Sequence, residues 1–195
     1  GYYGTGKYDP FHRNTPYAGL IEAFRGVIKK ILGESPEGLG YWKDCILGGV
    51  GRHIQMVIDF LPELECIVGV QPSLPEAMPD KTEKRFLNTC VEFLRVFARK
   101  EHPLVLFLDD LQWADSASLT LIEYVLCGAP LEHVFFIGAF RDNEVNGSHP
   151  LAVTLERLRS KAVPAGVLVL GPLGVEHIRQ AIVASLSKNV MEVQR

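Results

Sequence analysis

Two adjacent carboxylates follow an apolar run in the middle of the chain. Asp109 and Asp110 come directly after the five apolar residues of LVLFL, 104–108. An apolar run without alternation is typical of a strand buried on both faces of a parallel sheet. Ligands of open α/β sheets bind at the carboxyl ends of the strands. Because adjacent strand residues point to opposite faces, we expect the two acids to have different roles.

This pair has the chemistry of a Walker B motif. One carboxylate can hold a hydrated Mg²⁺ on the phosphates of a nucleotide, and the other can orient or activate the attacking water. The residues alone leave two alternatives open. The acids could only cap the loop after a core strand, or they could serve a two-carboxylate metal-dependent hydrolase. The sequence lacks the additional acids or histidines that such a hydrolase site needs.

The first ten residues, GYYGTGKYDP, imitate a phosphate-binding loop. The first seven positions of G-x-x-x-x-G-K-[ST] are matched by Gly1, Gly6 and Lys7. The eighth residue is Tyr8, which lacks the Ser/Thr hydroxyl that binds Mg²⁺. A phosphate loop also leads directly into a helix whose N-terminal amides bind the phosphates. Here Pro10 biases Asp9 away from helix, so we predict a strand over residues 2–8.

Strands and helices alternate after residue 100, which predicts an α/β parallel sheet with right-handed crossovers. Thr15-Pro16 and Ser35-Pro36 are helix starts, because a hydroxyl cap precedes a proline. Glycines after Leu47 end the second helix, and a proline-rich loop runs from Leu61 to Pro79. We expect strands over 2–8, 104–108, 134–140 and 167–170. We expect helices over 15–32, 35–47, 52–60, 81–99, 116–127, 149–160 and 174–186.

Composition excludes several functional classes. Twenty basic and 23 acidic residues leave a formal charge of −3, which gives no indication of a nucleic-acid or membrane partner. No apolar run reaches the roughly 18 residues of a membrane span. The cysteines form no C-x-x-C pair and the histidines show no zinc-binding spacing. We therefore expect a cytoplasmic protein whose thiols are buried and reduced; the cysteines are Cys45, Cys66, Cys90 and Cys127.

The sequence around the acid pair resembles a known family. LFLDDLQWADSASL is similar to the Walker B segment of AAA-type ATPase domains of the STAND group. Those domains lie in large signalling proteins, commonly between a protein-kinase-like domain and a sensor histidine kinase. The resemblance covers nearly all of residues 1–185. It includes PYAGLIEAFRGVIKKIL, FLPELECIVGVQPSLPE and FFIGAFRDNEV.

The resemblance implies roles for three residues. Asp109 matches the Walker B acid that holds Mg²⁺ through water, and Asp110 matches the acid that polarises the hydrolytic water. Arg141 falls where the family places its sensor-1 residue near the γ-phosphate, and a guanidinium there can offset transition-state charge. The alternative for Arg141 is a surface ion pair with Asp142 or Glu144. The residues themselves favour Asp115 as a helix cap and Trp113 as a packing residue.

The resemblance also implies a fold. It is a P-loop NTPase-like parallel sheet in three layers, α/β/α, from which the first strand and the Walker A loop are missing. In that alignment Lys7 matches a strand lysine and not the phosphate lysine. We expect an ATPase core over residues 1–172, the start of a helical lid over 173–195, and an unpaired sheet edge beside the Asp109 strand.

The implied function is a partial ATP- and Mg²⁺-dependent switch module of a larger signal-transduction protein. Its partners would be kinase-like, sensor or histidine-kinase domains of the same chain, and the module could form a nucleotide-dependent oligomer. Residues 1–195 alone would bind ATP weakly or not at all, so ATPase activity is expected only of the full-length protein. The alternative is a degenerate domain that acts as a protein-interaction scaffold without hydrolysis.

Overall fold

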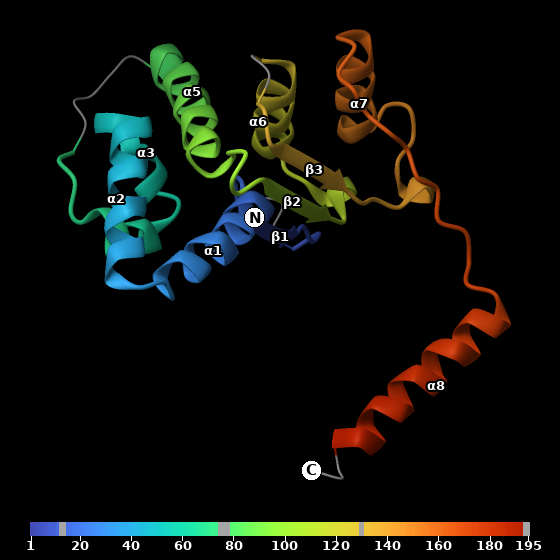
Figure 1. Ribbon diagram of the computed structural model, residues 1–195. Coiled ribbons are helices and arrows are strands. Elements are labelled where there is room, and N and C mark those ends of the chain that lie inside the picture. Colours follow the sequence, from blue (N-terminus) through green and yellow to red (C-terminus); the bar gives the residue numbers. More distant parts are fainter. Residues whose placement is uncertain (12–14, 74–78, 129–130, 193–195) are drawn as a thin grey trace. The chain divides into compact units, whose positions relative to one another are not determined.

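A computed structural model describes residues 1–11, 15–73, 79–128 and 131–192 of the chain (Figure 1). The chain divides into two compact units, Gly1–Val163 and Pro164–Arg195. The larger unit contains a sheet and the helices around it. The smaller unit contains the helix α8 (Val175–Glu192). Among the described residues, no helix is both long enough and apolar enough to cross a membrane.

Three parallel strands form the sheet of the larger unit: β1 (Tyr2–Lys7), β2 (Leu104–Asp109) and β3 (Val134–Gly138). Their order is β1-β2-β3, so β2 is central. This confirms the predicted parallel α/β sheet and the predicted strand at the start of the chain. The unpaired edge expected beside the Asp109 strand is wrong, because β2 is paired on both sides. The outer strands of the described sheet are β1 and β3.

In the described part of the larger unit, seven α-helices pack against this sheet or against one another. They are α1 (Ala18–Leu32), α2 (Pro36–Val50), α3 (Ile54–Ile58), α4 (Glu65–Val68), α5 (Pro79–Phe97), α6 (Ser116–Cys127) and α7 (Pro150–Ser160). Short 3₁₀ turns link them: η1 (Gly51–His53), η2 (Pro62–Leu64), η3 (Leu111–Trp113) and η4 (Asp142–Glu144). The α6 and α7 bounds agree with the predicted helices to within a residue.

Several helix boundaries differ from the prediction: α3 is shorter than 52–60, α5 begins and ends two residues before 81–99, and α8 continues past 186. Helix α1 does not start at Thr15, because Tyr17 takes a left-handed conformation (φ 63°) and the helix begins after it. Helix α2 starts after the Ser35 cap as predicted, but continues past the glycines to Val50. Gly49 serves close packing there, since a Cβ atom on it would come within 2.6 Å of a Val96 methyl on α5.

Two other segments also differ. Part of the predicted proline-rich loop forms η2 and α4, and residues 74–78 of that loop lie outside the described residues. The predicted strand over 167–170 is wrong, because these residues are not in a strand and their side chains are exposed. They belong to the smaller unit, which begins at Pro164. The predicted lid boundary at 172/173 stays a prediction.

The glycines of β1 allow helix α1 to approach the strand closely. A Cβ atom on Gly6 would come within 1.8 Å of the Gly19 carbonyl oxygen, and one on Gly4 within 2.5 Å of the Ala23 carbonyl oxygen. Any side chain at these two positions would therefore displace α1. Gly6, one of the two glycines that imitate a phosphate loop in GYYGTGKYDP, is thus explained by helix–strand packing.

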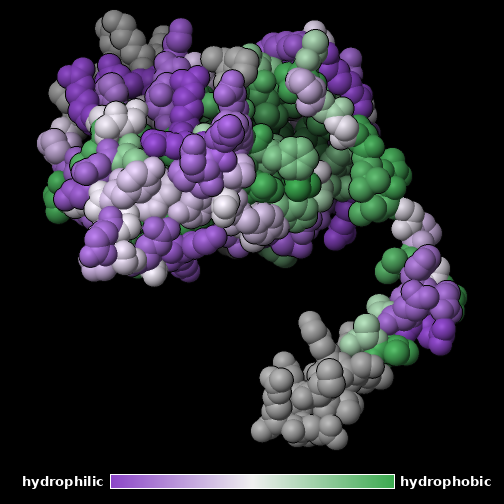
Figure 2. Space-filling view, in the orientation of Figure 1, coloured by the Kyte–Doolittle hydropathy of each residue, from purple (hydrophilic) through white to green (hydrophobic). Residues whose placement is uncertain are grey.

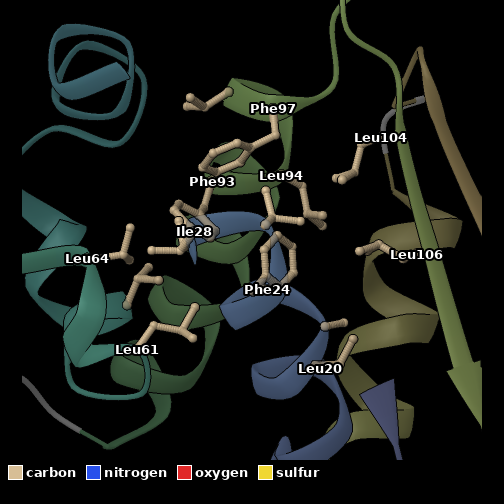
Figure 3. Close-up of a cluster of buried hydrophobic side chains, with 14 of the residues drawn as sticks. Leu20, Phe24, Ile28, Leu61, Leu64, Phe93, Leu94, Phe97, Leu104 and Leu106 are labelled. Atoms are coloured by element: carbon tan, nitrogen blue, oxygen red, sulfur yellow. The ribbon is translucent and has the colours of Figure 1, made fainter. Parts of the chain in front are cut away.

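The two faces of the sheet differ in burial. Leu104 and Leu106 of β2 are fully buried, and Figure 3 shows them facing side chains of α1 and α5. The opposite face carries Tyr3 of β1 and Phe135 of β3, which are 57% and 63% exposed. Figure 2 shows apolar side chains gathered at the surface on the side of β3. The expectation that β2 is buried on both faces is wrong, since its burial alternates along the strand.

The core of the larger unit is rich in aromatic contacts. Phe97 of α5 is completely buried, and its ring stacks on Trp42 of α2 with centroids 5.3 Å apart. The Phe93 ring meets Phe97 edge-on at 4.9 Å. Figure 3 shows Phe97 on α5 among the leucines that connect the helices with β2. Phe97 thus links the helical layer to the strand that carries the acid pair.

We predict that Phe97→Ala lowers the free energy of unfolding by about 3–5 kcal/mol, because it leaves a cavity in the core. The matched control is Phe11→Ala, since Phe11 is 91% exposed and should change stability by less than about 0.5 kcal/mol. Urea denaturation followed by circular dichroism measures both. Equal effects of the two substitutions would contradict the assigned core.

Candidate functional site

The acid pair lies where β2 turns into η3. Asp109 ends the strand, and Asp110 takes a left-handed backbone conformation with φ 52° and ψ 43°. Aspartate adopts this conformation more readily than most residues, because its short polar side chain can bond locally. The Asp110 N–H donates to Asp109 Oδ1 at 2.9 Å. The Asp109 side chain is 38% exposed and that of Asp110 only 12%, so the two acids have different environments.

Lys7 contacts both acids from the end of β1. The parallel register places Lys7 opposite Asp109. The Lys7 ammonium lies 3.3 Å from Asp109 Oδ2 and 3.0 Å from Asp110 Oδ2. The hydrogen bond from Lys7, followed by the one from Gln112, holds the pKa of Asp110 below its usual value. The hydrogen bonds of Lys7 to Asp110 and then to Asp109 raise the pKa of Lys7.

Gln112 connects the acid pair to the end of β3. It is almost fully buried, and its Nε2 donates to Asp110 Oδ1 at 3.0 Å. Its Oε1 accepts the Arg141 backbone N–H at 3.3 Å. Sequence reasoning did not single out this residue. The available signal was a polar amide between Leu111 and Trp113 in a turn that is otherwise apolar.

Arg141 joins the same network three residues after β3. Its Nε lies 3.6 Å from Asp110 Oδ1, and its Nη1 lies 3.2 Å from Glu144 Oε1. The side chain is 63% exposed, so it is held only at the edge of the site. The structure therefore brings together the three sequence-predicted residues Asp109, Asp110 and Arg141. The ion pair of Arg141 with Glu144, considered as an alternative, is also present.

Asp115 is a helix cap, as predicted. One of its oxygens accepts the Ser118 N–H at 2.8 Å at the start of α6, and the other accepts the Ser118 hydroxyl at 2.6 Å. Asp115 also accepts the backbone N–H of Tyr17 at 3.2 Å, which ties the start of α1 to the turn after β2. Trp113 packs against the hydrophobic core, as its predicted packing role requires.

The arrangement suits a divalent cation bound together with phosphates. The Lys7 ammonium shows that the space between the two carboxylates accepts positive charge, and oxygen donors are those that Mg²⁺ prefers. No group of three or more His, Cys, Asp or Glu side chains in the described ranges could hold a metal ion alone. A cation at Asp109 would thus need further oxygen ligands, which water alone or water together with a substrate can supply.

The fold and the position of the site define a class of protein. A parallel sheet with an acid pair at the carboxyl end of its central strand is the arrangement of nucleotide-binding α/β domains. The sequence profile of the AAA ATPase domain matches residues 1–137, which include β1, β2 and the acid pair. The chain therefore belongs to the AAA ATPase domain family.

Two relatives are large signalling kinases. The chain is 38% identical over 121 residues to hybrid signal transduction histidine kinase G of Dictyostelium discoideum. It is 26% identical over 141 residues to histidine protein kinase 1 of Candida albicans. These matches cover 62% and 64% of this chain, but only 4% and 6% of the relatives. No solved structure matches the chain.

We predict that Gln112→Leu lowers the free energy of unfolding by about 1–3 kcal/mol, because Asp110 Oδ1 and the Arg141 N–H each lose their hydrogen bond to the buried amide. The matched control is Gln55→Leu, since the Gln55 amide also donates to an aspartate, Asp59, but at the surface. Thermal and urea unfolding measure both variants. A loss for Gln112→Leu no larger than for Gln55→Leu would contradict the bridging role of Gln112.

Proposed function

We propose that the chain is part of an ATP-binding and ATP-hydrolysing switch module, in which Asp109, Asp110 and Arg141 act on the phosphates. The observation that carries this proposal is the single charged network at the carboxyl edge of β2 and β3. Family membership supports it, because ATP and Mg²⁺ are the ligands of AAA ATPase domains in general. The finer assignment to the STAND group belongs to the proposal.

Asp109 would hold Mg²⁺ through water at the end of β2. Asp109 is the last residue of β2, and its carboxylate is the more exposed of the two, so a hydrated ion can approach it. When bound, magnesium offsets the negative charge of the nucleotide phosphates.

Asp110 would orient and polarise the attacking water. Its lowered pKa keeps it a carboxylate at neutral pH, and a carboxylate can accept a hydrogen bond from water. Its backbone turn and the Gln112 amide fix its direction. The two acids thus differ in side-chain exposure and in their hydrogen-bond partners, as two different roles require.

Arg141 would contact the γ-phosphate and stabilise the charge of the transition state. The guanidinium is largely exposed, and its contact with Asp110 is long at 3.6 Å. It can therefore turn toward a phosphate without breaking a tight buried pair. Its backbone N–H stays bonded to Gln112, so its position at the site edge is kept.

The phosphate-binding loop would come from polypeptide outside residues 1–195. The glycines of β1 are occupied by packing against α1, so GYYGTGKYDP supplies no such loop. A further strand could pair with the outer edge of β3, because β3 is an outer strand of the described sheet and pairs there with β2. We propose that the strand preceding the Walker A loop fills this edge and that helices cover the open sheet face, completing a three-layer domain.

The proposed setting is a multidomain signalling protein of the cytoplasm. The chain spans a few per cent of two histidine kinases that it resembles, so its partners would be kinase-like, sensor or histidine-kinase domains of its own chain. A nucleotide-dependent oligomer is part of the same proposal. The smaller unit would begin a helical lid near residue 173, and α8 (Val175–Glu192) would be the first helix of that lid.

A second candidate function is a non-hydrolysing scaffold with the same fold. The observation that favours it is the Lys7 ammonium, which contacts both acids that hydrolysis would need. In that case the site would serve to hold β1 against β2, and no nucleotide would be turned over.

We predict that Asp110→Asn in the full-length protein slows ATP hydrolysis about 100-fold or more, because the water loses its carboxylate acceptor. ATP binding should change less than about threefold, since Asp110 is not assigned to bind the nucleotide. The control is Asp142→Asn, an acid one residue after Arg141 that is not paired with it. Hydrolysis by Asp110→Asn at the parent rate would contradict the role of Asp110. A parent protein that never hydrolyses ATP would favour the scaffold.

A further inference from the structure

Lys7 lies in the space that a cation on the acid pair would need. Its ammonium contacts Asp109 at 3.3 Å and Asp110 at 3.0 Å, so it faces both carboxylates at once. In the part of the chain that the structure describes, Asp110 also pairs with Arg141, whereas the ion pair of Asp109 is with Lys7. Lys7 is therefore the cation that neutralises Asp109, the acid assigned to the divalent ion, and it also contacts Asp110.

The Lys7 backbone is fixed while its side chain can move. The strand register pairs Lys7 with Asp109, and the Lys7 backbone N–H donates to a Glu22 carboxylate oxygen of α1 at 2.8 Å. The next residue, Tyr8, donates its N–H to the Asp109 carbonyl at 3.1 Å. The Lys7 side chain, in contrast, is 60% exposed. A long flexible side chain on a fixed strand can leave the carboxylates without any change in the sheet.

We propose that Lys7 is a tethered counter-cation, which occupies the Asp109–Asp110 pair in the absence of a divalent ion and must be displaced when the ion binds. The inference rests on the proposed function, because it takes Asp109 as the ligand of the ion. Two positive charges cannot share this space without strong repulsion. Lys7 thus competes with the divalent ion and raises the ion concentration at which the site is occupied. When the ion is absent, Lys7 offsets the repulsion between the two adjacent acids.

The test is the affinity of the chain for Mn²⁺ alone, measured by electron paramagnetic resonance of the free ion. Removing the competing charge with Lys7→Met should tighten Mn²⁺ binding about three- to tenfold, the range expected for a pair of partly exposed ion pairs. Lys7→Gln is a second neutral variant, and Lys7→Arg keeps the charge and should bind Mn²⁺ like the parent. Circular dichroism confirms that each variant is folded.

The matched control is Lys161→Met. The Lys161 ammonium makes the same kind of contact, 3.1 Å from a carboxylate oxygen of Glu123, and its side chain is 52% exposed. Lys161 follows the last residue of α7 and Glu123 lies in α6, so this ion pair does not involve the acid pair. Its removal changes the net charge equally, so a general effect of charge would appear in both variants. We expect no change in Mn²⁺ affinity for Lys161→Met.

Asp109→Asn separates the inference from the proposed function. If Asp109→Asn abolishes Mn²⁺ binding and both neutral variants of Lys7 tighten it, the inference is supported. If Asp109→Asn abolishes binding but the Lys7 variants bind like the parent or more weakly, the competing role of Lys7 is wrong and the metal site stands. If Asp109→Asn binds Mn²⁺ like the parent, the metal site and the inference are both wrong.

Discussion

The pairing of β2 with β1 on one side and β3 on the other places every charged group of the site. The β1 register brings Lys7 opposite Asp109. On the other side the pairing continues past the strands, because Ala139 donates to the Leu108 carbonyl and Leu111 donates to the Ala139 carbonyl, both at 2.9 Å. Since a slip by one residue would turn the buried leucines of β2 away from the core, the core holds this register and thereby the site.

At the carboxyl end of this sheet, two acidic and two cationic side chains neutralise one another. Lys7 and Arg141 come from the ends of the outer strands, and Asp109 and Asp110 come from the end of the central strand. Gln112 fixes Asp110 and the Arg141 backbone from inside, where it is shielded from water. The exposed Arg141 guanidinium can therefore change partners while the buried amide keeps the Arg141 backbone in place.

The sequence predicts the acid pair and its strand, because a local apolar run followed by two acids is visible without any long-range information. It does not reveal Gln112, because the backbone N–H of Arg141 that donates to its side chain lies 29 residues away, beyond the end of the next strand. The late start of α1 was missed for a similar reason, since the Tyr17 N–H bonds to Asp115, 98 residues away. The glycines of β1 allow α1 to pack closely on the strand, and their spacing along the chain cannot show this role.

The central claim is that the acid pair binds the cation of a magnesium–nucleotide complex. The most direct measurement is anomalous diffraction from crystals of a protein that contains this domain, grown with Mn²⁺ and a non-hydrolysable ATP analogue. We expect an anomalous peak beside the Asp109 carboxylate, with Lys7 turned away from both acids. A Mn²⁺ peak elsewhere on the nucleotide, with the Lys7 ammonium still between Asp109 and Asp110, would contradict it.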